Sequence, residues 1–211
     1  VALWLKDIGR PVAIINCTSA SSPFINELSG PDRIVVTATK SGYEHNFARF
    51  GDYLSAAIVD PRADIDKDEQ TSLLEAFLLA SSDTREFYAR EGRLATEHAL
   101  LDDNGDALGT PADWFQGTRA IKKAKAGAQL DGLKAGQLCL VKSRGEQELP
   151  PAVRSRRDQL EEELALLRER KGKLTEDEYL KLLEPLLVEI ARIYEGARPE
   201  GKSKDRPVRG F

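Results

Sequence analysis

The sequence is poor in several residue types that would narrow its class. Its 211 residues include no methionine, only two cysteines and only two histidines. Cys17 and Cys139 are too few for the disulfide framework of a small secreted domain, so they leave the redox compartment open. No apolar run approaches the roughly 18 residues of a membrane-spanning helix, and no targeting segment is recognisable. Because the chain begins at Val1 and lacks methionine, we expect a fragment or a processed form of a longer protein.

The charge of the chain gives no general reason to expect a nucleic-acid partner. Charged residues make up 31% of the sequence, and the formal net charge is −4. The basic cluster of Arg119, Lys122, Lys123 and Lys125 lacks interleaved aromatic residues, which is typical of a solvated helix face. Apolar residues make up 41% of the chain, so a folded core beneath a highly charged surface is expected.

Two short apolar runs predict buried strands. Residues 12–17 and 33–39 are each bounded by turn-forming residues, and a loop that contains Phe24, Ile25 and Leu28 joins them. Near-continuous apolar runs of this length are typical of parallel strands that are covered on both faces. The first run ends in small hydroxyl residues, and open α/β sheets place their chemistry at such strand ends. The sequence therefore predicts an α/β sheet.

Hydrophobic spacing predicts the remaining elements of this region. Helices are expected over 47–59, 72–90 and 112–126, and short strands over 97–101 and 138–141. The helix over 72–90 is the best marked, because Ser72 and Glu75 form a capping box in which each side chain binds a free backbone N–H. Residues 1–147 are thus predicted to form one α/β region.

The composition changes at Pro150-Pro151, and this pair predicts a boundary because proline neither continues a helix nor donates to a sheet. Beyond it, two heptad seams joined by a short loop predict an antiparallel helical hairpin over 152–195. The seams consist of Leu160, Leu164, Leu167 and Leu174, and of Tyr179, Leu183, Leu186, Ile190 and Ile193. Residues 196–211 are polar and rich in glycine and proline, which predicts a disordered tail.

The segment Asn16-Cys-Thr-Ser-Ala-Ser-Ser22 resembles the end of the nucleophile strand in caspase-like and, more closely, legumain-like cysteine peptidases. The resemblance covers residues 1–110 and rests on the order of several segments. These are the strand Arg33 to Thr39, the Phe50-Gly-Asp-Tyr-Leu54 helix, an Asp-rich loop leading into a Ser-x-x-Glu helix, and Asp102-Asp-Asn-Gly-Asp106. The order is similar to that of uncharacterised bacterial legumain-like proteins. It implies the carboxyl-terminal half of a caspase-like sheet flanked by helices, with the amino-terminal half absent.

The resemblance implies a nucleophile at the end of the first strand. Matching the cysteine of the family selects Cys17, and matching its Ser-Gly pair to Ser21-Ser22 selects Ser19. Matching the apolar strand selects Thr18. Because side chains alternate across a strand, a shift of one residue changes the face on which the thiol lies. Cys17 equally suits the simpler interpretation of a small buried hydrophobic residue, and we predict that it is inert.

The position of the histidine that would act as general base distinguishes two functional hypotheses. In the family the catalytic histidine precedes the nucleophile strand, whereas His45 and His98 both lie after it here. The expected function is therefore a catalytically degenerate peptidase homologue acting as a scaffold or interaction module. Its partner would be another protein or the missing amino-terminal portion of the same protein. The alternative is an active cysteine endopeptidase with Cys17 as nucleophile and its histidine base in that missing portion.

The loop from Asp64 to Glu75 matches an EF-hand calcium loop at positions 1, 3, 5, 9 and 12. Asp64, Asp66, Asp68, Ser72 and Glu75 occupy these positions and would supply the oxygen ligands that Ca²⁺ prefers. Glu69 stands where an EF-hand has glycine, and Pro61 interrupts any helix that would enter the loop. The simpler interpretation is an acidic linker whose charge favours the start of the next helix. No other cofactor is expected.

Overall fold

The computed structural model describes residues 2–5 and 8–196 and divides the chain into two compact units, Val1–Val141 and Lys142–Phe211. We call them the α/β unit and the helical unit. The division after Val141 places the short helix α6 (Arg144–Glu148) in the helical unit. The tail predicted over 196–211 lies outside the described residues, apart from Gly196.

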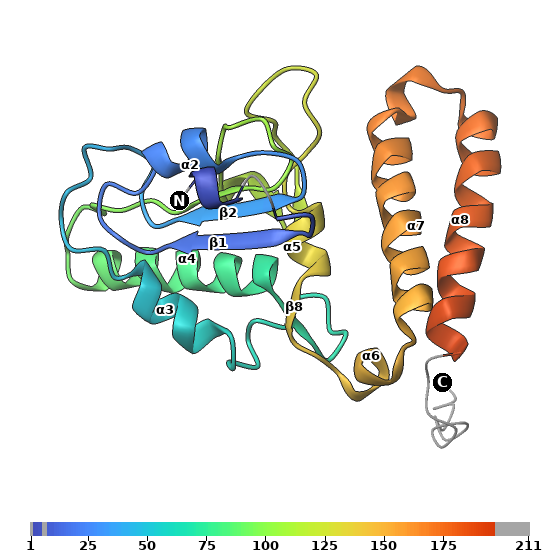
Figure 1. Ribbon diagram of the computed structural model, residues 1–211, viewed down its shortest axis with the longest axis horizontal. Helices are drawn as coiled ribbons and strands as arrows, with labels where there is room; N and C mark the ends of the chain where they lie inside the picture. The colour runs from blue at the N-terminus through green and yellow to red at the C-terminus, as the bar shows by residue number, and fades with distance from the viewer. Residues whose placement is uncertain (1, 6–7, 197–211) are drawn as a thin grey trace, which may run out of the picture. The chain divides into compact units, whose positions relative to one another are not determined.

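The α/β unit contains a four-stranded mixed sheet flanked by helices, in agreement with the predicted α/β class (Figure 1). In spatial order the strands are β1 (Val12–Asn16), β2 (Arg33–Thr37), β4 (Leu100–Asp102) and β5 (Thr110–Pro111). β1 and β2 are parallel, whereas β4 runs antiparallel to both of its neighbours. The residues that follow β1 and those that follow β4 therefore lie at opposite ends of the sheet.

Helices cover both faces of the sheet. The longer ones are α2 (Pro23–Leu28), α3 (Phe50–Ala57) and α4 (Leu73–Arg90), beside the short α1 (Ala2–Leu5) and α5 (Leu133–Gln137). Figure 1 shows α3 and α4 on one side of the sheet and α2 on the other. Because side chains alternate along β2, Ile34 and Val36 join the core beneath α3 and α4, and Val35 joins a smaller core with α2. Burial on both faces explains why the middle of this strand, Ile34 to Val36, is a continuous apolar run.

Two predicted segments have a different structure. The predicted helix over 112–126 is wrong, because the chain forms the 3-10 helix η1 (Ala112–Trp114) and a hairpin of β6 (Phe115–Gln116) and β7 (Arg119–Ala120). Gly117 takes φ +59° in the hairpin turn, a left-handed conformation that glycine adopts without steric cost. The predicted loop between β1 and β2 contains α2, which begins at Pro23, and proline is preorganised for the first turn of a helix.

The predicted start of α4 is confirmed. The Ser72 hydroxyl accepts the N–H of Glu75 at 3.2 Å, and the Glu75 carboxylate accepts the N–H of Ser72 at 2.9 Å. Just before the helix, β3 (Thr71–Ser72) pairs with β8 (Cys139–Val141) near the end of the unit. This pairing fixes the loop that leads into α4 at its carboxyl-terminal end.

The helical unit is formed by α6, α7 (Pro151–Glu169), η2 (Lys171–Lys173) and α8 (Glu176–Gly196). Arg156, near the start of α7, binds Glu189, near the end of α8, at 2.8 Å, so the two helices run in opposite directions (Figure 1). The α7 seam residues Leu160, Leu164 and Leu167 are buried. No residue of α8 is fully buried, although its seam residues are half-buried.

A buried ion pair extends the α7 seam. Arg157, only 3% exposed, lies three residues before Leu160 and binds Glu146 of α6. Arg154 reaches the same carboxylate at 2.7 Å. A charged residue at a seam position needs a partner when it is buried, and Glu146 and Arg154 complete this cluster.

Candidate functional sites

Cys17, the first candidate nucleophile, packs against a helix. It follows β1 directly and is half-buried beside the core under α3. A Cβ atom at Gly51 would lie 2.8 Å from Cys17 Cβ and 3.3 Å from its Sγ, so only glycine fits at this point of α3. Burial, and after it the charges of Asp52 and Glu97, raises the pKa of the Cys17 thiol. The surroundings therefore disfavour the thiolate that a nucleophile requires.

Ser19, the second candidate, is part of a loop that is fastened by its hydroxyl groups. The Ser19 hydroxyl donates to the carbonyl of Asn46 at 2.6 Å. The buried Ser21 hydroxyl accepts the N–H groups of Ala38 at 3.0 Å and Thr39 at 3.2 Å. These bonds attach the loop after β1 to the segment after β2. The hydroxyl-rich motif therefore serves the connection between two strands.

The two histidines have other partners. His98 Nδ1 lies 2.6 Å from Glu44 Oε1, and the His45 ring meets Tyr43 edge-on with centroids 6.5 Å apart. Over the described ranges 2–5 and 8–196, no interaction joins either histidine to Cys17 or Ser19. The structure therefore does not assemble a dyad from the residues that it describes.

Glu97 was not singled out from the sequence, yet it organises the neighbourhood of Cys17. Its carboxylate is 4% exposed and accepts the N–H groups of Arg49 and Phe50 at 2.9 Å and the hydroxyl of Tyr88 at 3.0 Å. It thereby satisfies free donors at the start of α3, as an acidic group at a helix amino terminus does. The only sequence signal was a glutamate in the segment before β4.

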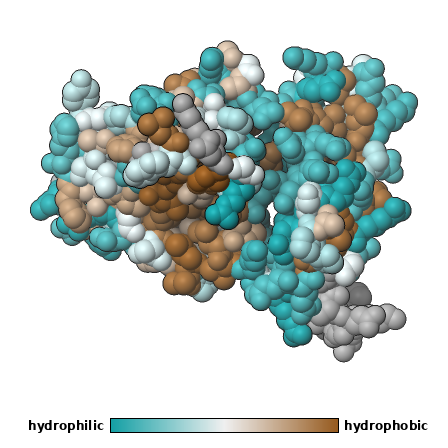
Figure 2. Space-filling model, in the orientation of Figure 1, coloured by the Kyte–Doolittle hydropathy of each residue, from teal (hydrophilic) through white to brown (hydrophobic). Residues whose placement is uncertain are grey.

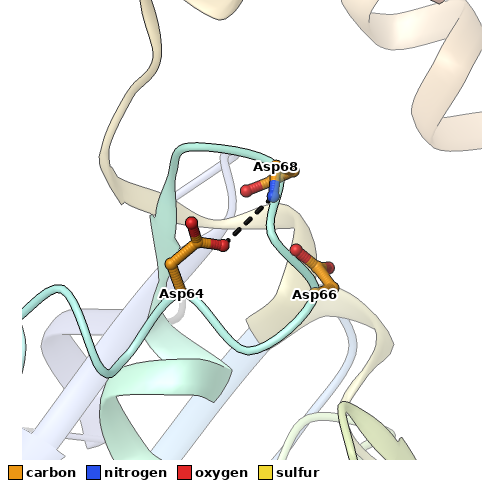
Figure 3. A group of neighbouring side chains, drawn as sticks. All are labelled: Asp64, Asp66 and Asp68. Atoms are coloured by element: carbon orange, nitrogen blue, oxygen red, sulfur yellow. Dashed lines mark hydrogen bonds between the residues drawn. The ribbon is translucent and has the colours of Figure 1, made fainter. Parts of the chain in front are cut away.

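The three aspartates of the 64–75 loop converge (Figure 3). One carboxylate oxygen from each of Asp64, Asp66 and Asp68 lies within 4.8 Å of the others. The N–H of Asp68 donates to Asp64 Oδ1 at 3.1 Å. Although Asp66 is exposed, partial desolvation in the loop and then the charges of Asp68 and Glu75 raise its pKa to about 6. Crowding of like charges on one loop makes a cation favourable there.

The other two predicted ligands of this loop bind each other. Glu75 is 2% exposed, and its second oxygen accepts the N–H of Ile65 at 2.8 Å. Ser72 and Glu75 are thus engaged in the capping box, with the Glu75 carboxylate holding the loop together. Glu69 takes φ +66°, so the backbone adopts the left-handed turn for which an EF-hand uses glycine.

A second acidic segment follows β4, and its Asp103 forms a buried pair with Asp131, which lies just before α5. Asp103 accepts the N–H groups of Gly132 and Ala135 at 2.8 Å. Asp131 accepts the N–H groups of Asp103 and Asn104 at 3.0 and 3.1 Å and the Thr110 hydroxyl at 2.5 Å. Burial raises the pKa of Asp131 to about 7. The pair ties the turn after β4 to α5.

Comparison with protein-family models, with curated proteins and with solved structures gives no match for this chain. Within the described part of the chain, no helix combines the length and the apolar character needed to cross a membrane. The functional argument therefore depends on the geometry of the sites themselves.

Proposed function

We propose that this chain is a catalytically degenerate homologue of caspase-like and legumain-like peptidases that acts as a protein-interaction module. The environment of Cys17 carries the proposal. Its thiol is packed beside Gly51, and burial followed by the charges of two acidic groups raises its pKa. Activated cysteines instead lie beside cations or at open helix amino termini, where the thiolate is stabilised.

Thiol labelling tests this proposal. The Cys139→Ser variant leaves Cys17 as the single cysteine, and Cys17→Ser serves as the matched control. We expect slow reaction of native Cys17 with iodoacetamide at neutral pH and faster reaction as pH rises beyond the ordinary thiol pKa, because the thiolate fraction stays small below it. Rapid stoichiometric labelling at neutral pH, with loss of a measurable peptidase activity, would favour the active endopeptidase instead.

The free edge of β1 supports the interaction role. The N–H of Val12 donates to Asp32 and the carbonyl of Asn16 accepts from Ala38, so alternate residues of β1 face β2. The backbone groups of Ala13 and Ile15 consequently face away from the sheet, where no described strand pairs with them. Ile15 is 42% exposed, and Figure 2 shows apolar surface over the part of the unit where β1 lies. An added strand from a partner or from a preceding portion of the protein would satisfy this edge.

A proline substitution in β1 tests whether a partner pairs with the free edge of this strand. Ala13→Pro removes an outward N–H without removing a bond to β2, and Ala13→Ser retains that N–H. A protein partner isolated from source cells with the wild-type chain should be retained by Ala13→Ser and lost by Ala13→Pro. Equal retention by both variants would show that the partner binds elsewhere.

We also propose that the 64–75 loop binds Ca²⁺. The convergence of Asp64, Asp66 and Asp68 and the left-handed backbone at Glu69 support this proposal. Calorimetry with Ca²⁺ should lose one site in Asp64→Asn. Glu69→Gly should bind more tightly by about 1 kcal/mol, because a non-glycine residue is strained at this φ. A binding isotherm unchanged by Asp64→Asn would contradict the proposal.

A further inference from the structure

The turn after β4 contains two buried carboxylate oxygens that accept no hydrogen bond. Asp102 is 1% exposed, and its Oδ1 accepts the N–H of Gly105 at 3.0 Å, but its Oδ2 is buried without a partner. Asp106 Oδ1 accepts the N–H of Leu108 at 2.8 Å, and its Oδ2 is also buried without a partner. Buried carboxylate oxygens are almost always hydrogen-bonded, so two orphans in one turn need an explanation.

The neighbouring Asp103 differs, because both of its oxygens accept backbone N–H groups. The turn therefore has donors for one buried carboxylate and leaves specific oxygens of the other two unpaired.

Hydrogen bonds join the turn to two other segments of the α/β unit. The Ser29 hydroxyl accepts the N–H of Ala107 at 3.1 Å, and the Asn104 side chain donates to the carbonyl of Gln129 at 2.9 Å. Gly105 takes φ +82°, and a Cβ there would lie 3.1 Å from the carbonyl oxygen of Gly30. The turn is thus joined to Ser29 and to Gln129, and its close approach to Gly30 favours glycine at position 105.

The same turn repeats the pattern of the 64–75 loop. Asp102, Asn104 and Asp106 alternate as Asp64, Asp66 and Asp68 do. The fourth and sixth positions are left-handed in both loops: Gly105 and Ala107 here, with φ +82° and +63°, and Lys67 and Glu69 there, with φ +65° and +66°. The chain therefore forms this backbone twice, at two separate places in the α/β unit.

We infer that the turn Asp102 to Asp106 is a second site for a divalent cation of the Ca²⁺ type, bound through Asp102 Oδ2 and Asp106 Oδ2. Hard anionic oxygens are the ligands that this cation takes, and water would complete its shell. The site is shorter than an EF-hand. Counted from Asp102, the ninth and twelfth positions are Thr110, whose hydroxyl already binds Asp131, and Asp113, which is exposed on η1. The inference is independent of the proposal for the 64–75 loop.

Calorimetry on the full chain separates the two sites. In the Asp64→Asn background, Ca²⁺ should still bind once. Adding Asp106→Asn should abolish that binding, and adding Asp113→Asn, the matched control, should leave it unchanged. Absence of Ca²⁺ binding to Asp64→Asn, or undiminished binding after Asp106→Asn is added, would overturn the inference. If only the proposal for the 64–75 loop were wrong, the single variant Asp64→Asn would bind Ca²⁺ with the same isotherm as the wild type.

Thermal melting supplies a second readout that a purely structural role would not produce. In metal-free buffer with chelator, Asp102→Asn should melt no lower than the wild type, because it removes a buried carboxylate charge that lacks a partner. On addition of Ca²⁺, the Asp64→Asn variant should gain melting temperature, and the Asp64→Asn, Asp102→Asn double variant should not. If Asp102→Asn instead melted lower in chelator and gained as much as the wild type in Ca²⁺, its carboxylate would be structural and the inference wrong.

Discussion

Three buried carboxylates of the α/β unit are held mainly by backbone N–H groups, whereas the buried carboxylate of Glu146 in the helical unit is held by arginines. Glu75, Glu97 and Asp103 each accept backbone donors near the start of a helix. Glu146 of the helical unit is bound by the Arg154 and Arg157 side chains. Backbone donors are fixed by the fold, while an arginine is a single side chain that one substitution removes. The two units should therefore respond differently to mutation and to pH.

The two units can be observed separately. Trp4 and Trp114 both belong to the α/β unit, so tryptophan fluorescence reports on that unit alone. α7 and α8 are the longest helices of the described residues, so far-UV circular dichroism is sensitive to the helical unit. Each prediction below uses this contrast.

The largest expected effect is that of Leu164→Asp. Leu164 is 7% exposed in the seam. Burial of one leucine side chain contributes about 1.5–3 kcal/mol to stability, and burying an unpaired charge in its place costs more than this. We expect loss of most of the circular dichroism of α7 and α8 with unchanged tryptophan fluorescence. Leu182→Asp is the control, because Leu182 is 47% exposed and should change stability by no more than about 0.5 kcal/mol. A single transition that unfolds both units would show that they are one cooperative domain.

Arg157→Met comes next. It leaves Glu146 buried with fewer partners, which should destabilise the helical unit by about 3–5 kcal/mol. The double variant Glu146→Leu with Arg157→Met should recover most of that loss, since an apolar pair replaces the ion pair. Urea unfolding followed by circular dichroism measures both changes. Failure of the double variant to recover would mean that the pair contributes net stability.

Glu97→Gln tests a carboxylate of the α/β unit. The amide group would place an N–H against the N–H groups of Arg49 or Phe50, so we expect a loss of about 1–3 kcal/mol. Tryptophan fluorescence during urea unfolding should show the loss, and the circular dichroism of the helical unit should not. Glu86→Gln, on the exposed side of α4, is the matched control. Equal effects of the two substitutions would refute the capping role of Glu97.

The smallest expected effect is a pH dependence due to Asp131. Its pKa is raised to about 7 in the folded state, so between pH ~4 and 7 the folded state binds more protons than the unfolded state. The free energy of unfolding of the α/β unit should therefore fall as pH rises through this window. Asp131→Asn should flatten that slope in chelator-containing buffer. A slope that is identical in the variant would assign the pH dependence to other groups.

Local patterns in the sequence determined much of the secondary structure of both units. The apolar runs of β1 and β2, the capping box at Ser72 and the seam of Leu160, Leu164 and Leu167 are all visible without coordinates. They depend on side-chain periodicity and on neighbours within four residues, which a sequence displays directly. The hairpin at Gly117 was misread as a helix, because spacing of apolar residues does not reveal a left-handed glycine.

The sites were decided by tertiary structure. Only the fold places Glu97 at the start of α3, Gly51 against Cys17 and Arg157 beside Glu146. In the acidic loops the sequence supplied the spacing of the aspartates, but the folded backbone set the left-handed turns at Glu69 and Ala107. Within the Asp102 turn, the fold supplies backbone donors to both oxygens of Asp103 but leaves one oxygen of Asp102 and one of Asp106 without a hydrogen bond. Hydrogen-bond partners come from segments far apart in the chain, and burial makes them decisive, so no local pattern could reveal them.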